Sequence, residues 1–319
     1  MTTHAQYPAI DINGKLTLAS RMSALVFAII VPALATIVAI VLAFHGRVTW
    51  VDLSIFAVMY FLGGIGVTVG YHRLFTHRSF ETSTPIRYAL ALMGGMSAQG
   101  APIMWASQHR QHHAFPDEEG DPHSPYLGRR PGLLGALRAL WHSHYGHIFS
   151  QIETIDPRKY APDLEREPFL RLLEKHSAWL VLSSFAIPFA AGWMITGSLT
   201  GGLTGLLWGG LVRLFVVTHV TGAVNSICHY FGSRRFELAD ESRNVWWLSL
   251  PTLGESWHQN HHAFPTSARH GFEWWEVDPS WLFILGMEKV GLASNVVRID
   301  PHRRRLKEVK GVKETDRVA

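Results

Sequence analysis

Four apolar stretches constrain the fold of this 319-residue chain more than any other feature. They run from about 22 to 44, 53 to 70, 179 to 195 and 203 to 220. Each approaches the roughly 20 apolar residues that a helix needs to cross about 30 Å of hydrocarbon. Only 17% of the residues are charged, fewer than the roughly 25% typical of soluble domains. We therefore predict four transmembrane helices.

Short connectors within each pair of stretches predict two helical hairpins. Residues 45–50 join the first pair, and residues 196–202 join the second. The first connector carries one cation, Arg47, and the second carries none, whereas most Lys and Arg residues lie between the pairs and in the C-terminal tail. Cytoplasmic loops carry an excess of these residues. Both termini and the region between the hairpins are therefore expected to face the cytoplasm.

The expected architecture is an all-α integral membrane protein with a cytoplasmic helical cap. It comprises an N-terminal segment 1–21, one membrane domain 22–297 whose cap is 71–178 and 221–297, and a basic, disordered tail 298–319. A further apolar stretch, 88–105, contains Gly94, Gly95, Gly100 and Pro102. We interpret it as a buried or re-entrant helix, because a span there would place the preceding and following histidines on opposite membrane faces.

Histidines gather in three short clusters that point to metal binding. These are His72 and His77; His109, His112 and His113; and His258, His261 and His262. The last two clusters have the spacing i, i+3, i+4, which places three side chains on one side of a helix. At the end of the fourth stretch, Asn225 and His229 have the spacing i, i+4. Nine imidazoles exceed the ligands of one ion, so we predict two metal ions.

Composition argues against several other classes of protein. The single cysteine, Cys228, excludes a disulfide within the chain and a thiolate-rich zinc site. No basic stripe interleaves with aromatic residues, so nucleic acid is not an expected partner. Imidazole-rich paired sites favour redox iron over structural zinc. A histidine-rich metal transporter or sensor remains an alternative from a different class.

The order of the motifs HRLFTH, HRQHH, NSICH and HQNHH resembles the membrane fatty-acyl desaturases, and among them the Δ9 acyl-CoA desaturase branch. The resemblance implies two iron ions that activate O₂ as co-substrate. It implies that one iron is bound by His72, His77, His109, His113 and His262. It assigns His112, His229, His258 and His261 to the other, with Asn225 contacting it through water. A related membrane hydroxylase or epoxidase is the alternative enzyme.

A saturated acyl chain is expected to lie in a dry, narrow tunnel, because burial of each methylene contributes about 0.8 kcal/mol to binding. The resemblance implies where this tunnel lies. Tyr60 and Gly64 are expected near its blind end, and Thr221 and Gly222 along it. Glycine at position 64 could equally serve helix packing. Close helix packing and a longer tunnel thus remain two explanations of the same residue.

The acyl carrier is expected to be CoA, with a lipid-bound acyl group as the alternative. Ser107-Gln108 stands where animal acyl-CoA members of the family carry Arg-Asp, which weakens the CoA assignment. Arg158 and Lys159 could contact a head group instead, although such a pair on a cap is more often solvated or near lipid headgroups. Electrons are expected from a separate carrier, such as ferredoxin with its reductase.

Overall fold

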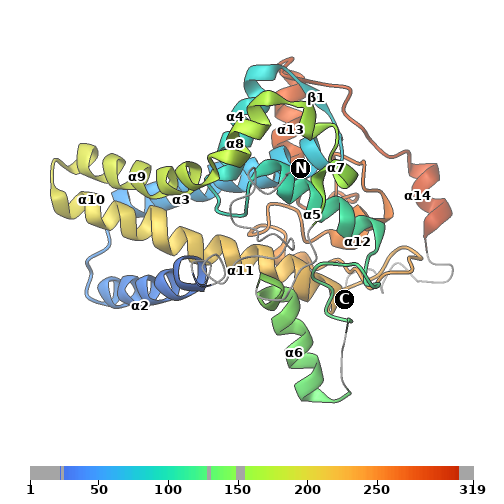
Figure 1. Cartoon of the computed structure of the whole chain (residues 1–319), viewed down its shortest axis with the longest axis horizontal. Coiled ribbons are helices and arrows are strands. Elements are labelled where there is room, and N and C mark those ends of the chain that lie inside the picture. The colour runs from blue at the N-terminus through green and yellow to red at the C-terminus, as the bar shows by residue number, and fades with distance from the viewer. Residues whose placement is uncertain (1–21, 23–24, 128–130, 149–154, 309–319) are drawn as a thin grey trace, which may run out of the picture.

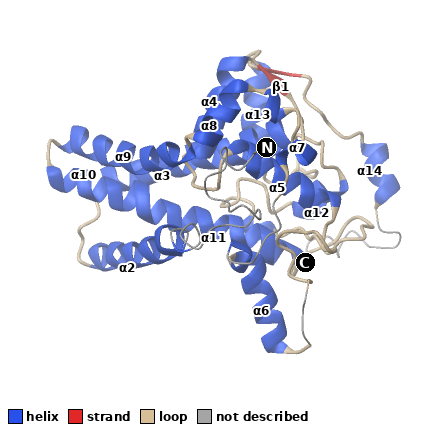
Figure 2. Cartoon of the chain, viewed as in Figure 1, coloured by secondary structure: helices blue, strands red, loops and turns tan. Residues whose placement is uncertain are grey.

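The computed structural model describes residue 22 and residues 25–127, 131–148 and 155–308. Helices make up nearly all of its regular structure, and β1 and β2 form a short antiparallel pair in which Glu81 faces Ser294 (Figure 2). Long helices run side by side at one end of the molecule, and the shorter helices gather at the other end (Figure 1). The segment 1–21, which is expected to be cytoplasmic, lies outside the described residues.

The elements follow one another in this order: η2 (Leu25–Ile30), α2 (Val31–Phe44), α3 (Trp50–Ile65), η3 (Gly66–Thr76), β1 (Glu81–Thr82), α4 (Thr84–Gly95), α5 (Pro102–Ala114), α6 (Leu133–His144), η4 (Gly146–Ile148), α7 (Pro157–Tyr160), η5 (Leu164–Arg166), α8 (Pro168–Lys175), α9 (Ser177–Thr196), α10 (Leu199–Gly205), η6 (Leu206–Val212), α11 (Arg213–Ser226), η7 (Ile227–His229), η8 (Trp246–Leu248), α12 (His258–Ala263), α13 (Pro279–Lys289), β2 (Ala293–Ser294) and α14 (Pro301–Lys307). The segments η2, η3 and η6 are π-helical and continue neighbouring α-helices, whereas η4, η5, η7 and η8 are single 3₁₀ turns.

Four continuous helices are long and apolar enough to cross a membrane. They are Leu25–Phe44, Trp50–Thr76, Ser177–Thr196 and Leu199–His229. The first and third match the expected stretches closely. The second and fourth, of 27 and 31 residues, extend beyond them. Their extensions deliver His72 and His229 directly, so the same helices that would cross the bilayer also carry metal-binding side chains.

Local sequence explains where the long helices begin and end. Thr49 and Asp52 form a reciprocal capping box at the start of α3, which satisfies backbone donors that a helix start leaves unpaired. Gly197 ends α9 in the left-handed conformation, and the side chain of Ser198 accepts from Gly201 N to begin α10. A Cβ on Gly192 would lie 2.1 Å from Gly201 O. Glycine at this position is therefore needed for the close approach of α9 and α10.

The stretch 88–105 divides into two helices, α4 and α5, separated by residues 96–101. It is not one of the four candidate spans in the described part of the chain. The carboxylate of Glu174 accepts from Ile103 N at 2.9 Å, at the start of α5. The main apolar core packs around η3, α4, α5 and α8 and includes Tyr71 and Leu170. This core fixes the direction of α5, which carries three of the histidines.

The expected disorder of the tail is wrong for its first part. Asp300 accepts backbone hydrogen bonds at the start of α14, and Lys307 Nζ donates to Ala263 O at 2.8 Å, at the end of α12. Backbone bonds also tie Glu237 N to Lys307 O. A basic sequence thus becomes ordered because it finds the carbonyl end of a helix. Residues 309–319 lie outside the described residues.

Candidate metal centre

The nine histidines expected as ligands come together from η3 and its C-terminal end, α5, η7 and α12. They form two groups, each with ligand nitrogens within 4.8 Å of one another. One group contains His72, His77, His109, His113 and His261, and the other contains His112, His229, His258 and His262. The two groups are adjacent, since the rings of His113 and His262 lie 4.7 Å apart. Sequence positions almost 200 residues apart therefore meet at one place.

The division between the groups corrects the expected one at two residues. His261 belongs with His72, and His262 belongs with His112, whereas the resemblance implied the reverse. The reason is helical geometry. Residues i and i+4 are closest in direction around a helix, and the ring centroids of His258 and His262 are 4.4 Å apart, against 6.0 Å for His258 and His261. In each HxxHH motif the outer pair shares one group and the middle histidine joins the other.

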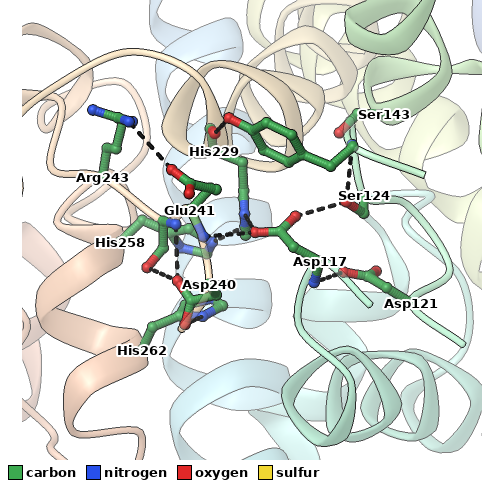
Figure 3. Close-up of polar contacts among 12 residues, drawn as sticks. Asp117, Asp121, Ser124, Ser143, His229, Asp240, Glu241, Arg243, His258 and His262 are labelled. Atoms are coloured by element: carbon green, nitrogen blue, oxygen red, sulfur yellow. Dashed lines mark hydrogen bonds and ion pairs between the residues drawn. The ribbon is translucent and has the colours of Figure 1, made fainter. Parts of the chain in front are cut away.

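Carboxylates orient several of these rings by contacting Nδ1, the ring nitrogen that points away from the other ligands. Asp121 Oδ2 lies 2.9 Å from His112 Nδ1, and Asp117 Oδ2 lies 3.0 Å from His229 Nδ1. Figure 3 shows Asp117 and Asp240 placed around the second group. In the first group, Glu255 Oε2 lies 2.5 Å from His72 Nδ1. A carboxylate at Nδ1 leaves Nε2 unprotonated and fixes the ring, which is the usual outer support of a metal-binding histidine.

The Nε2 atoms of neighbouring histidines face one another. The Nε2 atoms of His229 and His258 are 2.9 Å apart, and those of His72 and His261 are 3.0 Å apart. The carboxylates at Nδ1 of His72 and His229 leave the Nε2 lone pairs of these two rings available to a cation. A metal about 2.0–2.1 Å from each nitrogen would place neighbouring ligand nitrogens roughly 2.9–3.4 Å apart. The nitrogen positions therefore fit bound metal.

Most of these rings favour the neutral form. Burial, and then the neighbouring imidazoles, lower the pKa values of His77, His109, His113, His258, His261 and His262 well below the usual histidine value. Burial also acts to lower the pKa of His112, but the charge and hydrogen bond of Asp121 outweigh it and raise that pKa. Metal ions bind the neutral form of imidazole. These histidines are therefore in the protonation state that can bind a cation.

Two further histidines, the buried His270 and the partly buried His123, lie against the groups. The His270 ring is 4.6 Å from that of His261, and its Nδ1 is 3.6 Å from Glu255. The His123 ring is 4.5 Å from that of His112. Neither was expected as a site residue, nor were Asp117, Asp240 and Glu255. Asp121 and His123 form one short motif, Asp-Pro-His, and this spacing was the available signal for their role.

A pocket opens beside both groups, with walls from α3, α11 and the loop before α12. Its lining includes Tyr60, Gly64, Val217, Thr221, Asn225 and Leu253, together with ligands from both groups. The lining of this pocket is predominantly apolar. Three of the four expected tunnel residues thus line one largely apolar pocket, and Asn225 lies in the same wall.

Gly222 and the expected head-group residues lie elsewhere. A Cβ on Gly222 would come 2.8 Å from the His144 ring, so this glycine faces α6 and is not among the residues that line the pocket. Arg158 is exposed and paired at 3.1 Å with Asp156, the N-cap residue of its own helix. Lys159 Nζ lies 4.7 Å from the centre of the Tyr160 ring. Neither cation lines the pocket.

A model of the fatty acid desaturase family matches residues 48–279. The chain is 42% identical over 271 residues to the hex-5-enoyl-(acyl-carrier protein) acetylenase of Moorena producens (strain JHB), which covers 84% of this chain and 83% of that protein. It is 39% identical over 267 residues to Delta-9 acyl-lipid desaturase 1 of Arabidopsis thaliana, covering 82% and 81%. It is 36% identical over 261 residues to an acyl-CoA 5-desaturase of Anemone leveillei, covering 81% and 74%.

The family match extends over both histidine groups and three of the four apolar helices, and the first helix, Leu25–Phe44, lies before it. The family resemblance noted from the histidine motifs is therefore confirmed. With its mostly helical structure and its two groups of converging imidazoles, this chain belongs to the fatty acid desaturase family.

Proposed function

We propose that this protein is an O₂-dependent desaturase that introduces a cis double bond, at C9, into a saturated long-chain acyl group. The observation that carries the proposal is the contact between the two imidazole groups and one largely apolar pocket. His72 and His109 of the first group, and His112 and His258 of the second, line that pocket. A saturated chain in it would lie beside both groups.

The reaction converts –CH₂–CH₂– and O₂, with two electrons and two protons, into –CH=CH– and two molecules of water. Two iron ions held by the nine histidines would supply the oxidising power that cleavage of an unactivated C–H bond requires. The electrons would come from a separate carrier such as ferredoxin with its reductase. We further propose the topology expected from the charges, with both termini and the metal centre on the cytoplasmic side.

The chain's own residues position the substrate. Val217, Val220 and Val224 give the α11 wall an apolar surface, and Leu253 covers Gly64 on the opposite side. Burial of methylenes in such a pocket contributes about 0.8 kcal/mol each. The hydroxyl of Tyr60 donates to Pro251 O, which fixes its ring in the lining. Asn225, which lines the pocket as His258 does, would contact the second iron through water.

For the acyl carrier we propose a membrane lipid, with acyl-CoA as the alternative. Ser107 is fully buried and donates to Ile103 O at 2.7 Å, so it offers nothing to a CoA head group. Arg158 is engaged by Asp156. Two of the relatives are named for a lipid-bound or carrier-protein-bound acyl group, and one for acyl-CoA. A lipid-bound chain needs no cationic clamp for a phosphorylated nucleotide.

Expression in a host that lacks unsaturated fatty acids tests the reaction. With an electron donor supplied, we expect a cis-monoene at C9, located by mass spectrometry, which disappears in His261→Ala. A product that gains oxygen would support the hydroxylase or epoxidase instead. Exchangeable zinc without O₂ consumption would support the transporter or sensor. Purified enzyme supplied with stearoyl phosphatidylcholine or stearoyl-CoA then decides the carrier, and turnover of the CoA ester alone would overturn the lipid assignment.

A further inference from the structure

Helix α6 has two contrasting faces. Gly135, Ala139 and Ser143, spaced by four residues, are buried. The other side carries large exposed apolar residues, namely Leu133, Leu134, Leu137 and Trp141. Their spacing places them within about a third of the helical circumference. In the view of Figure 1, α6 points away from the bundle and across the direction of α11. Its apolar side is therefore unlike a surface that water normally covers.

Specific polar contacts hold the end of α6 against α11. Ser143 Oγ donates to Asn225 O at 2.6 Å. The His144 ring forms hydrogen bonds with Ser226 Oγ at 3.0 Å and with His219 Nδ1 at 3.2 Å. Because Gly222 lacks a side chain, this ring can approach the helix. The attachment lies in the last turns of the candidate span Leu199–His229, so the depth of α6 is fixed relative to that span.

A second exposed apolar element is attached to the same part of α11. In η8, Leu248 is buried in a cluster with Ala223 and Cys228. Its neighbours Trp246 and Trp247, and the following Leu250, are exposed. The contacts of α6 and η8 thus fall on one short segment, residues 219–228. We call their exposed residues the collar: Leu133, Leu134, Leu137, Trp141, Trp246, Trp247 and Leu250.

We propose that the collar is seated in the headgroup region of the membrane leaflet around the end of this span. Two elements about a hundred residues apart bring leucine and tryptophan to one level of one apolar helix. A bilayer surface is continuous around a spanning helix and fits both elements. Tryptophan is enriched at this level of membrane proteins, and an amphipathic helix there buries its apolar side about 5–10 Å into the boundary.

The collar also adjoins the pocket. Leu250 is followed directly by Pro251, Thr252 and Leu253, all of which line the pocket. Across α11, Val217, Thr221 and Val224 line the pocket, whereas Gly222 and Ser226 contact α6. Lipid in contact with the collar would therefore touch elements directly joined to two walls of the pocket, α11 and the loop before α12. The inference itself requires no desaturase activity.

Site-directed fluorescence in proteoliposomes of the full-length protein tests the collar. The native Cys228 is fully buried, so an introduced cysteine can be labelled selectively with a nitrobenzoxadiazole maleimide. Leu134→Cys and Leu137→Cys report on the collar. Leu306→Cys is the matched control, because Leu306 is 73% exposed against 71% for Leu134 and lies in α14, far from the bundle (Figure 1). Leu34→Cys, on the exposed side of α2, is the positive control.

In vesicles of phosphatidylcholine that carry a nitroxide near the top of one acyl chain, we expect both collar probes to lose most of their fluorescence. The α14 probe should keep its fluorescence and be quenched by aqueous iodide instead. Iodide quenching of the collar probes equal to that of the α14 probe would overturn the proposal. So would protection from both quenchers that disappears when the protein is diluted in lipid, because a second copy would then cover the collar.

Discussion

The substitution Asp121→Asn should weaken one metal-binding group selectively. Both oxygens of this buried carboxylate accept hydrogen bonds. Oδ2 lies 2.9 Å from His112 Nδ1 and 2.9 Å from Asp117 N, and Oδ1 lies 3.0 Å from His123 N. An amide has one accepting oxygen and one donating nitrogen. Whichever way the side chain turns, its NH₂ group faces at least one N–H donor.

The less costly orientation keeps the oxygen toward His112 and leaves His123 N unpaired. One unsatisfied buried donor costs about 1–3 kcal/mol of folding stability. The bond to His112 loses its charge, and charge-assisted bonds are roughly twice as strong as neutral ones. Because loss of an outer-shell partner typically costs about 10–100-fold in metal affinity, and this bond is weakened and not removed, we expect about a tenfold loss at the second group.

Anaerobic titration of iron-depleted protein against a chelating indicator measures both affinities, and circular dichroism checks the fold. Glu255→Gln is the matched counterpart, since Glu255 likewise accepts from two donors, His72 and Arg73, but supports the first group. His229→Ala and His77→Ala identify which binding step belongs to which group. Unchanged affinities in a native Asp121→Asn protein, or equal losses at both steps, would refute the role given to this carboxylate.

Three other predictions concern the pocket and the cap. Gly64→Phe should shorten the acyl chains that are desaturated, because even a Cβ there would lie 2.5 Å from Leu253 Cδ1. Product chain lengths in the expression host measure this, with Leu62→Phe, exposed on the same helix and outside the pocket lining, as control. Gly222→Ala should lower the free energy of unfolding by about 1–3 kcal/mol, because the added methyl group would overpack against His144. A lower unfolding midpoint would show this. Gly286→Ala is the control and should not lower the midpoint, because a Cβ at Gly286 has no neighbouring atom within 4 Å. Burial raises the pKa of Glu174 from 4.5 to about 7. As pH rises, the unfolded chain loses this proton before the folded protein does, so the free energy of unfolding should fall between pH 4.5 and about 7, by at most about 3 kcal/mol. Melting curves of Glu174→Gln should lack this part of the pH dependence. Identical pH profiles for the variant and the native protein would contradict the role given to Glu174.

Periodic patterns allowed much of the centre to be predicted. Apolar length identified four helices that the structure also finds apolar and long enough to cross a membrane. The i, i+3, i+4 spacing placed the three histidines of each HxxHH motif on one side of a helix, and all of them take part in the two groups. His229 could be added because it stands four residues after Asn225 at a helix end. These inferences rest on spacings within one helix, where sequence and geometry correspond directly.

Contacts between distant segments could not be predicted in the same way. Helical spacing pairs His258 with His262, but which histidines of α5 this pair joins depends on how α12 is rotated against α5. Gly222 was expected in the tunnel wall, but its environment is set by His144, 78 residues earlier in the chain. Charged residues such as Lys307 suggested a disordered tail, although this side chain contacts Ala263 O. Composition carries no information about which buried carbonyl a distant cation will meet.

The mixed origin of each imidazole group also constrains how the protein is made. The first group needs His72 from the second apolar helix and His261 from α12, and the other needs His112 and His262. All four candidate spans precede α12 in the chain. During synthesis, neither group can be complete until every span has left the ribosome. Metal loading of the full centre must therefore follow the emergence of the entire bundle, and a cell that makes this protein needs a metal source able to reach a chain whose helices are already made.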